Sequence, residues 1–154
     1  MSELLGESDL AHLEAAIDSW LGRARGENPV ILAVDRDAEV PRRWYVRLRG
    51  EEKDVTTVWF TLGQRTLRYE TYVLPAPEEN HAEFYEHLLR RNETLVGAHF
   101  SIGAEDAVFL RGELPVSLLD DAELDRILGT LYATVERCFR PALVVGFASR
   151  FRTR

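Results

Sequence analysis

The stretch of sequence that decides the fold is Leu74–Pro115, LPAPEENHAEFYEHLLRRNETLVGAHFSIGAEDAVFLRGELP. The prolines at positions 75 and 77 end a strand, since proline lacks the N–H that a strand ladder needs. A helix follows, because apolar residues recur there at three- and four-residue steps. The residues expected to form its buried stripe are Phe84, Tyr85, Leu88 and Leu89.

A β-hairpin is expected directly after this helix. Residues 95–102 and 107–113 are apolar enough to form two strands, and the four residues 103–106 between them suit a hairpin loop. Pro115 closes the pair, because proline does not continue a strand ladder. The stretch therefore predicts a strand end, a helix and a hairpin, in that order.

Four more strands are expected before this stretch, and one helix at each end of the chain. The strands are predicted at 30–34, 43–49, 55–62 and 66–74. Ser8 can cap a first helix over 8–25. Asn80 and Asp120, each followed three residues later by a glutamate, are expected to cap the second and third helices. Pro141 is expected to end or kink the third helix.

The resulting order of elements is α-β-β-β-β-α-β-β-α. It predicts an α+β fold in which an antiparallel sheet of about five to six strands packs with three helices. With 154 residues, the chain has the length of one ordinary domain, 1–154. Within it we expect the helix over 8–25, a region of sheet and helices over 30–151, and a free tail over 152–154.

The second predicted strand, 43–49, alternates strictly between two kinds of side chain. One face interleaves an aromatic residue with guanidinium groups, a pattern that suits either an acidic peptide or single-stranded nucleic acid. The simpler interpretation, which we favour, is a solvent-facing strand side paired with Glu70 and its neighbours across the sheet. The residues on this face are Arg43, Tyr45, Arg47 and Arg49.

The third predicted strand, 55–62, carries apolar bulk on both faces. Val58, Phe60 and Leu62 share one face, while Val55 and Trp59 lie on the other. Large exposed apolar patches are uncommon on monomers, so the second face needs a cover. We therefore expect a homodimer or a protein or peptide partner. The candidate partner-binding or dimer surface is Val55, Trp59, Arg43, Tyr45 and Arg47.

The composition describes a globular protein and argues against two kinds of partner. Hydrophobic residues make up 45% and charged residues 29% of the chain, which is far from the composition of disordered proteins. The formal charge of −7 opposes generic attraction to nucleic acid or to anionic membranes. The chain lacks a signal-like start or a long apolar run, which indicates a cytoplasmic protein. Its single cysteine, Cys138, is expected to be a small buried hydrophobe.

The chain offers no recognisable catalytic or cofactor-binding motif. Glycine-rich phosphate loops and the GxSxG elbow are absent, and paired CxxC zinc signatures cannot be written with one cysteine. We therefore expect no enzyme activity, no nucleotide, no metal and no other cofactor.

Two weak exceptions have simpler explanations. Glu83 and His87, with His81 or His99, could contribute to a metal site, but a solvated helical pair explains them better. Asp120 and Asp121 lie where helix-capping residues are expected.

Three segments resemble the YbjN family, a group of bacterial proteins labelled sensory transduction regulators. The resemblance covers roughly 30–151, and the family has no agreed catalytic residues to transfer. The segments that carry it are VLPAPEENHAEFYEHLLRRN at 73–92, GAHFSIGAEDAVFLRGELP at 97–115 and LDRILGTLYATVERCFRP at 124–141.

The resemblance implies the fold of type III secretion chaperones, dimers that hold extended segments of partner proteins without nucleotide or metal. We accordingly expect a non-enzymatic binding or regulatory module with chaperone-like recognition of an extended protein segment. The alternative is a signal transduction regulator that senses a small ligand between sheet and helices, for which a pocket with convergent polar groups would be needed.

Overall fold

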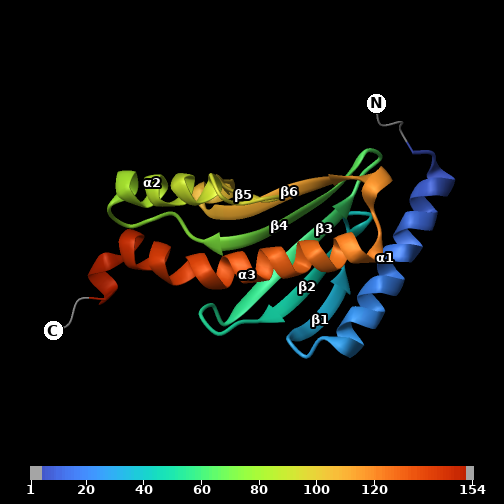
Figure 1. Ribbon diagram of the computed structural model, residues 1–154, viewed down its shortest axis with the longest axis horizontal. Helices are drawn as coiled ribbons and strands as arrows, with labels where there is room; N and C mark the ends of the chain where they lie inside the picture. Colours follow the sequence, from blue (N-terminus) through green and yellow to red (C-terminus); the bar gives the residue numbers. More distant parts are fainter. Residues whose placement is uncertain (1–4, 152–154) are drawn as a thin grey trace.

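The computed structural model describes residues 5–151 (Figure 1). The described chain forms three α-helices and six β-strands, in the predicted order. The helices are α1 (Glu7–Glu27), α2 (His81–Asn92) and α3 (Asp121–Gly146). The strands are β1 (Ile31–Arg36), β2 (Arg43–Arg49), β3 (Val55–Leu62), β4 (Thr66–Leu74), β5 (His99–Ile102) and β6 (Val108–Pro115).

All six strands belong to one antiparallel sheet with the order β1-β2-β3-β4-β6-β5. The first four strands form a meander, and α2 carries the chain from β4 to the far edge, so that β6 returns beside β4. The two edge strands are therefore β1 and β5. This architecture confirms the predicted α+β class and the predicted order of elements.

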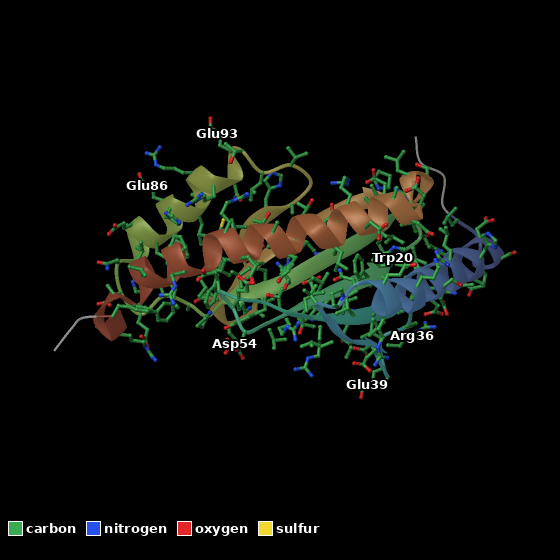
Figure 2. The ribbon with its side chains drawn as sticks, turned by 60° about the horizontal axis from the view of Figure 1, so that its bottom comes forward. Trp20, Arg36, Glu39, Asp54, Glu86 and Glu93 are labelled. Carbon is green, nitrogen blue, oxygen red and sulfur yellow. The ribbon has the colours of Figure 1, made fainter. Side chains whose placement is uncertain are left out.

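One face of the sheet is covered by the helices and contains the core. On β2 and β3 every second side chain is buried, and Trp44, Val46, Val58 and Phe60 are at most 1% exposed. Burial of each such large apolar side chain stabilises the fold by roughly 1.5 to 3 kcal/mol. In Figure 2, α2 and α3 lie above the sheet, and below it only side chains are drawn.

The long helices are fixed to this covered face by named contacts. The ring of Trp20 on α1 packs edge-on against Phe60 at 6.1 Å between centroids, and its Nε1 donates to Asp125 of α3 at 2.8 Å. Trp44 Nε1 donates to Asp18 of α1 at 2.7 Å. Because α1 contacts both β-sheet and α3 through Trp20, it closes the core at the β1–β3 end of the sheet.

Two of the predicted helix caps are wrong, and one is confirmed. The first helix begins at Glu7 after Gly6, so Ser8 lies inside its first turn. Asn80 precedes α2 but adopts a left-handed conformation, and its amide donates to the carbonyl of Val145 at 3.0 Å instead of capping. Asp120 does cap α3, since its carboxylate accepts the N–H of Glu123 at 2.8 Å.

Helix ends were harder to predict than helix positions. The first helix continues through two glycines to Glu27, because its buried side chains outweigh the penalty of about 1 kcal/mol that each glycine carries. Pro141 does not end α3, which continues to Gly146. The predicted tail at 152–154 lies outside the described residues.

The predicted strand over 95–102 is shorter in the structure. It begins only at His99, because Gly97 has a φ of +82° and residues 93–95 form turns after α2. Its partner runs over Val108–Pro115 rather than over 107–113, since the pairing with β4 extends to Pro115. The first strand likewise lies at Ile31–Arg36 rather than at 30–34.

Candidate functional site

The face of the sheet opposite the helices, here called the open face, has no helix of the described chain across it (Figure 2). Along β2, β3 and most of β4 its side chains alternate with the buried ones and are half-buried or exposed. It contains Arg43, Tyr45, Arg47, Arg49, Val55, Thr57, Trp59, Thr61, Arg68, Glu70, Tyr72, Phe109, Arg111 and Glu113.

The structure brings all five predicted site residues together on this open face. In the ladder between β2 and β3, Tyr45 lies opposite Trp59, and Arg49 lies opposite Val55. Arg43 and Arg47 flank Tyr45 on the same side of β2. The strict alternation of β2 and β3 was the signal that made this grouping predictable.

Four aromatic rings form a continuous band across the open face. We call Tyr45, Trp59, Phe109 and Tyr72 the aromatic band. Neighbouring rings meet edge to face, with centroids 6.0 Å apart for Tyr45–Trp59, 6.3 Å for Trp59–Phe109 and 5.7 Å for Phe109–Tyr72. The band crosses from β2 to β6, so it offers a rigid apolar strip on a sheet face without helices.

Phe109 and Tyr72 were missed by sequence reasoning. Phe109 is only 6% exposed although it lies on the open face. The hairpin loop passes over it so closely that a Cβ at Gly103 would lie 2.5 Å from the ring. The available signal was the alternation along β6, which places Phe109, Arg111 and Glu113 on one face. The sequence alone does not show whether this set or the alternate set faces the helices.

Charged side chains on the open face fall into two groups. On β4 and β6 they are paired: Arg111 Nε lies 3.2 Å from Glu70 Oε1, and Arg68 Nε lies 3.6 Å from Glu113 Oε1. The expected pairing of Glu70 therefore occurs with β6 and not with β2. No ion pair within the described chain involves the β2 arginines Arg43, Arg47 and Arg49.

Arg43 and Tyr45 are held in place by polar neighbours. Arg43 Nε donates to the hydroxyl of Thr61 at 3.0 Å. The hydroxyl of Tyr45 donates to the Asp37 carboxylate, which also accepts the N–H groups of Glu39 and Val40. These hydrogen bonds lower the pKa of Asp37 to about 2, with the Tyr45 bond as the largest cause. At neutral pH Asp37 is therefore charged and fixes the Tyr45 ring.

Lys53, the only lysine, closes one end of the aromatic band. Its Nζ donates to the carbonyl of Tyr72 at 2.7 Å and lies 5.2 Å from the centroid of the Tyr72 ring. It also lies 5.9 Å from the ring of Phe139 on α3. Burial lowers the pKa of Lys53 to about 8. The carbonyl and the two rings favour its charged form, so we assign it a structural role between sheet and helix.

The two edges of the sheet differ in their free backbone groups. At β5, the side-chain amide of Asn92 accepts the N–H of Phe100 at 2.7 Å and donates to its carbonyl at 3.1 Å. Asn92 therefore occupies the pairing position that a neighbouring strand would use. This contact closes the centre of the β5 edge. It thereby protects the edge from association with other strands, which unpaired edges invite.

The outward backbone groups of β1 have no such side-chain partner, although α1 runs beside this strand (Figure 1). Asp37 N–H donates to the carbonyl of Arg43 at 2.9 Å, so the alternating pattern of an antiparallel ladder directs the N–H and C=O groups of Val34 and Arg36 away from β2. In the described chain these outward groups make no hydrogen bond. The side chains of Leu32, Asp35 and Arg36 are exposed. The β1 edge is thus available for pairing.

The weak catalytic and metal candidates are not brought together. His99 lies opposite Arg111 and faces the open side, whereas Glu83 and His87 belong to α2 on the helical side. Across residues 5–151, no group of three or more His, Cys, Asp or Glu side chains could hold a metal ion. Burial lowers the pKa of His87. Asp121 forms an ion pair with Arg23 of α1.

Two surface cavities lie outside the open face. A groove of about 240 Å³ runs between α2 and β5 and is lined mainly by apolar side chains such as Tyr85, Leu89 and Ile102. A cavity of about 380 Å³ lies between the end of α1, the turn that follows it, β2 and α3, with Asp125 and Tyr132 in its lining. None of the helices within residues 5–151 is long and apolar enough to cross a membrane.

Curated relatives with a similar sequence are uncharacterised mycobacterial proteins. The chain is 32% identical over 114 residues to Rv0487 of Mycobacterium tuberculosis, and the match covers 74% of this chain and 62% of that protein. It is 32% identical over 107 residues to ML2442 of Mycobacterium leprae, covering 70% of this chain and 58% of the relative. The chain thus spans about three fifths of the length of the relatives it matches.

Solved structures with a similar fold come from two protein complexes. One is the heterodimeric ExoU–SpcU complex from the type III secretion system of Pseudomonas aeruginosa, with a TM-score of 0.50, 14% identity, and coverage of 81% of this chain and 98% of that chain. The other is the ExsC–ExsE complex, with a TM-score of 0.53, 18% identity, and coverage of 82% and 96%. These similarities confirm the type III secretion chaperone-like fold that the resemblance implied.

The family comparison agrees with the three segments that carried the resemblance. The sequence model of the YbjN family, described as "Putative bacterial sensory transduction regulator", matches residues 12–143. That range includes the meander, α2, the hairpin and most of α3. The chain belongs to the YbjN family.

Proposed function

We propose that this protein is a non-enzymatic binding module that holds an extended segment of a partner protein at the β1 edge and across the open face. The observation that carries the proposal is the aromatic band on a sheet face without a covering helix. Rigid aromatic side chains are the usual anchors of protein recognition. The fold is shared with chains found in two protein complexes, which supports a protein as partner.

The geometry suggests how such a segment is held. A strand added beside β1 would bond to the outward N–H and C=O groups of Val34 and Arg36, and side-chain pockets would supply selectivity. The following residues of the segment would turn onto the open face and reach Trp59, two strands further in. Backbone pairing supplies affinity and the aromatic band supplies an anchor.

The test compares loss of an aromatic anchor on the open face with loss of an exposed leucine elsewhere on the surface. Partner proteins are first identified by co-purification from the native host. Trp59→Ala should lower their affinity for this protein about thirtyfold, because loss of a hot-spot aromatic side chain costs about 2 kcal/mol of binding free energy. Leu118→Ala, which removes an exposed leucine outside both the open face and the α2–β5 groove, is the matched control and should leave binding unchanged. Circular dichroism must show both variants folded. A confirmed partner whose affinity is the same for wild type and Trp59→Ala refutes the proposal.

We also propose that the protein is a homodimer in the cytoplasm. The most exposed apolar side chains of the described chain include Leu89, Val96 and Ile102, which are 67%, 79% and 54% exposed around the α2–β5 groove. Since Asn92 closes the adjacent strand edge, a second copy would pack there through side chains. Light scattering should give about twice the 17.6 kDa chain mass. A monomer at every concentration, or a dimer unaffected by Leu89→Ala, contradicts this assignment.

The alternative function is sensing of a small ligand in the cavity beside α1. Asp125 and Tyr132 converge on it, which favours a polar ligand. However, Asp125 already accepts from Trp20, and the hydroxyl of Tyr132 donates to the carbonyl of Arg49 at 2.9 Å. Both side chains thus already make contacts that hold the fold together, so this function ranks second. A metabolite that raises the melting temperature of wild type but not of Tyr132→Phe would favour it.

A further inference from the structure

The charged side chains beside the β1 edge differ along its length. Ala33 lies opposite Arg47 in the β1–β2 ladder, and Asp35 lies opposite Tyr45. All four belong to the open side of the sheet, because their positions alternate with the buried Val46. The edge is therefore cationic beside Ala33 and acidic beside Asp35. In Figure 2, Arg36 and Glu39 mark the end of β1 next to α1.

Arg47 is separated from the β1 edge by one small residue. Arg47 is exposed and makes no ion pair, although nine other arginines of the described chain do. The residue between it and the edge is Ala33, whose side chain is a single methyl group. Strands lie about 4.8 Å apart, so a strand added to β1 would be about 10 Å from β2. An extended arginine and a glutamate together span this distance.

Aspartate at position 35 gives the opposite preference two residues further on. It is exposed and makes no ion pair within residues 5–151. An acidic side chain placed directly beside it would meet a like charge, which is destabilising for neighbours across a sheet. The carboxylate of Asp37 follows at the same end of the strand and is charged at neutral pH. The β1 edge thus disfavours an acidic ligand side chain beside Asp35, although it favours one beside Ala33.

We infer that the segment held at the β1 edge is acidic at the position beside Ala33, where Arg47 pairs with its carboxylate across the alanine, and is not acidic beside Asp35. This inference rests on the proposed function and names the chemistry of its partner. It also explains how a chain of net charge −7 binds an acidic segment, since the attraction comes locally from the Arg47 side chain on β2.

The probes are capped eight-residue peptides that alternate valine with threonine, with one central threonine replaced by glutamate, glutamine or lysine. When such a peptide pairs with β1 as a strand, its valines lie on the same side of the sheet as Val34 and its variable residue lies on the open face. Binding to the full chain is followed by fluorescence anisotropy. At low salt the glutamate peptide should bind about fivefold more tightly than the glutamine peptide, and the lysine peptide most weakly. In 1 M salt, where the Debye length is about 3 Å, the difference should fall below about twofold.

Protein variants assign the preference to Arg47. Arg47→Gln should remove the preference for glutamate, and Arg47→Glu should reverse it in favour of lysine. Arg137→Gln is the matched control, since Arg137 is an exposed arginine of α3 without an ion pair. It changes the net charge equally and should leave the preference intact. Circular dichroism shows that each variant is folded.

Each other outcome overturns the inference in a distinct way. Equal binding of all three peptides to wild type contradicts the charge preference and leaves the proposed function standing. No binding of any peptide, together with a native partner that ignores the β1 edge, contradicts both. Tighter binding of a twelve-residue oligothymidine than of any peptide makes Arg47 part of a nucleic-acid site. Self-association that Arg47→Glu abolishes makes the edge an interface between copies.

Discussion

The two edges of the sheet are treated in opposite ways. At β5 the centre of the edge is closed by Asn92, whose amide satisfies both the N–H and the carbonyl of Phe100. At β1 the outward groups of Val34 and Arg36 make no hydrogen bond within residues 5–151. Proteins usually protect such edges, because they recruit other strands. One closed and one open edge on the same sheet fit the proposed function, in which the open edge pairs with the partner.

The same contrast separates two apolar surfaces. The groove beside the closed edge holds the more exposed side chains, Leu89 and Ile102. The open face holds the aromatic band, whose rings contact one another, and Phe109 is nearly buried. A surface can therefore be built for binding without having the greatest exposure. The proposed function places an extended segment on the open face because rigid rings and an unpaired strand edge lie together there.

Proline substitutions at the two sheet edges should have the largest effect on binding. The N–H of Val34 points away from β2, and proline is tolerated in edge strands at such positions, so Val34→Pro should fold but lose one pairing bond and obstruct the edge. We expect partner affinity to fall by roughly a hundredfold, about 2.7 kcal/mol. Affinity is measured by calorimetry with the purified partner segment.

The matched control is Ile102→Pro at the other edge. Ile102 alternates with Phe100 on β5, so its N–H also points outward, and Asn92 already closes the centre of that edge. It should leave partner affinity unchanged. Equal losses from Val34→Pro and Ile102→Pro would show that the edges do not differ in function.

The next largest effect is expected when the β5 edge is opened by removing Asn92. Asn92→Ala leaves the N–H and carbonyl of Phe100 without their partner and should lower the free energy of unfolding by about 1 to 3 kcal/mol. The freed edge should also promote association at higher concentration. Urea unfolding and light scattering measure the two effects. Glu93→Ala is the neighbouring control; Figure 2 shows Glu93 at the outer surface of the molecule. A stable, unchanged Asn92→Ala would mean that the amide does not protect the edge.

The smallest expected effect concerns pH at the end of the open edge. The pKa of Asp37 is lowered to about 2 by the Tyr45 hydroxyl and two backbone N–H groups, so the charged carboxylate stabilises the fold above its unfolded pKa near 3.8. This contribution should disappear as the pH falls from about 4 to 2. Urea midpoints of wild type and Asp37→Asn should therefore differ at pH 6 and converge near pH 2. A constant difference across this range would contradict the assigned role.

The fold was largely predictable because its elements have strong local signals. The alternation of Arg43–Arg49 and Val55–Leu62 predicted two strands with correct bounds and correct faces. Caps were less predictable, since Ser8 and Asn80 have the right side chains but make no capping bond. Asn80 instead binds Val145, a residue 65 positions away, and such long-range contacts leave no local pattern.

The candidate site was predictable only on the strands that are neighbours in sequence. Trp59 and Tyr45 come from consecutive strands, and a hairpin pairing brings them together. Phe109 joins them because β6 returns beside β4 after α2 and β5. The closure of β5 by Asn92 depends on the turn after α2, which places an amide from a helix end against a strand. Neither contact follows from periodicity.

Hydrogen–deuterium exchange of the protein with and without its bound partner segment tests the central claim most directly. We predict that the amides of Val34 and Arg36 exchange more slowly in the complex, because they become hydrogen-bonded to the added strand. The amides of β5, from His99 to Ile102, should not change. Protection confined to β5 and α2, with Val34 and Arg36 exchanging as fast as in the free protein, would contradict the claim that β1 is the binding edge.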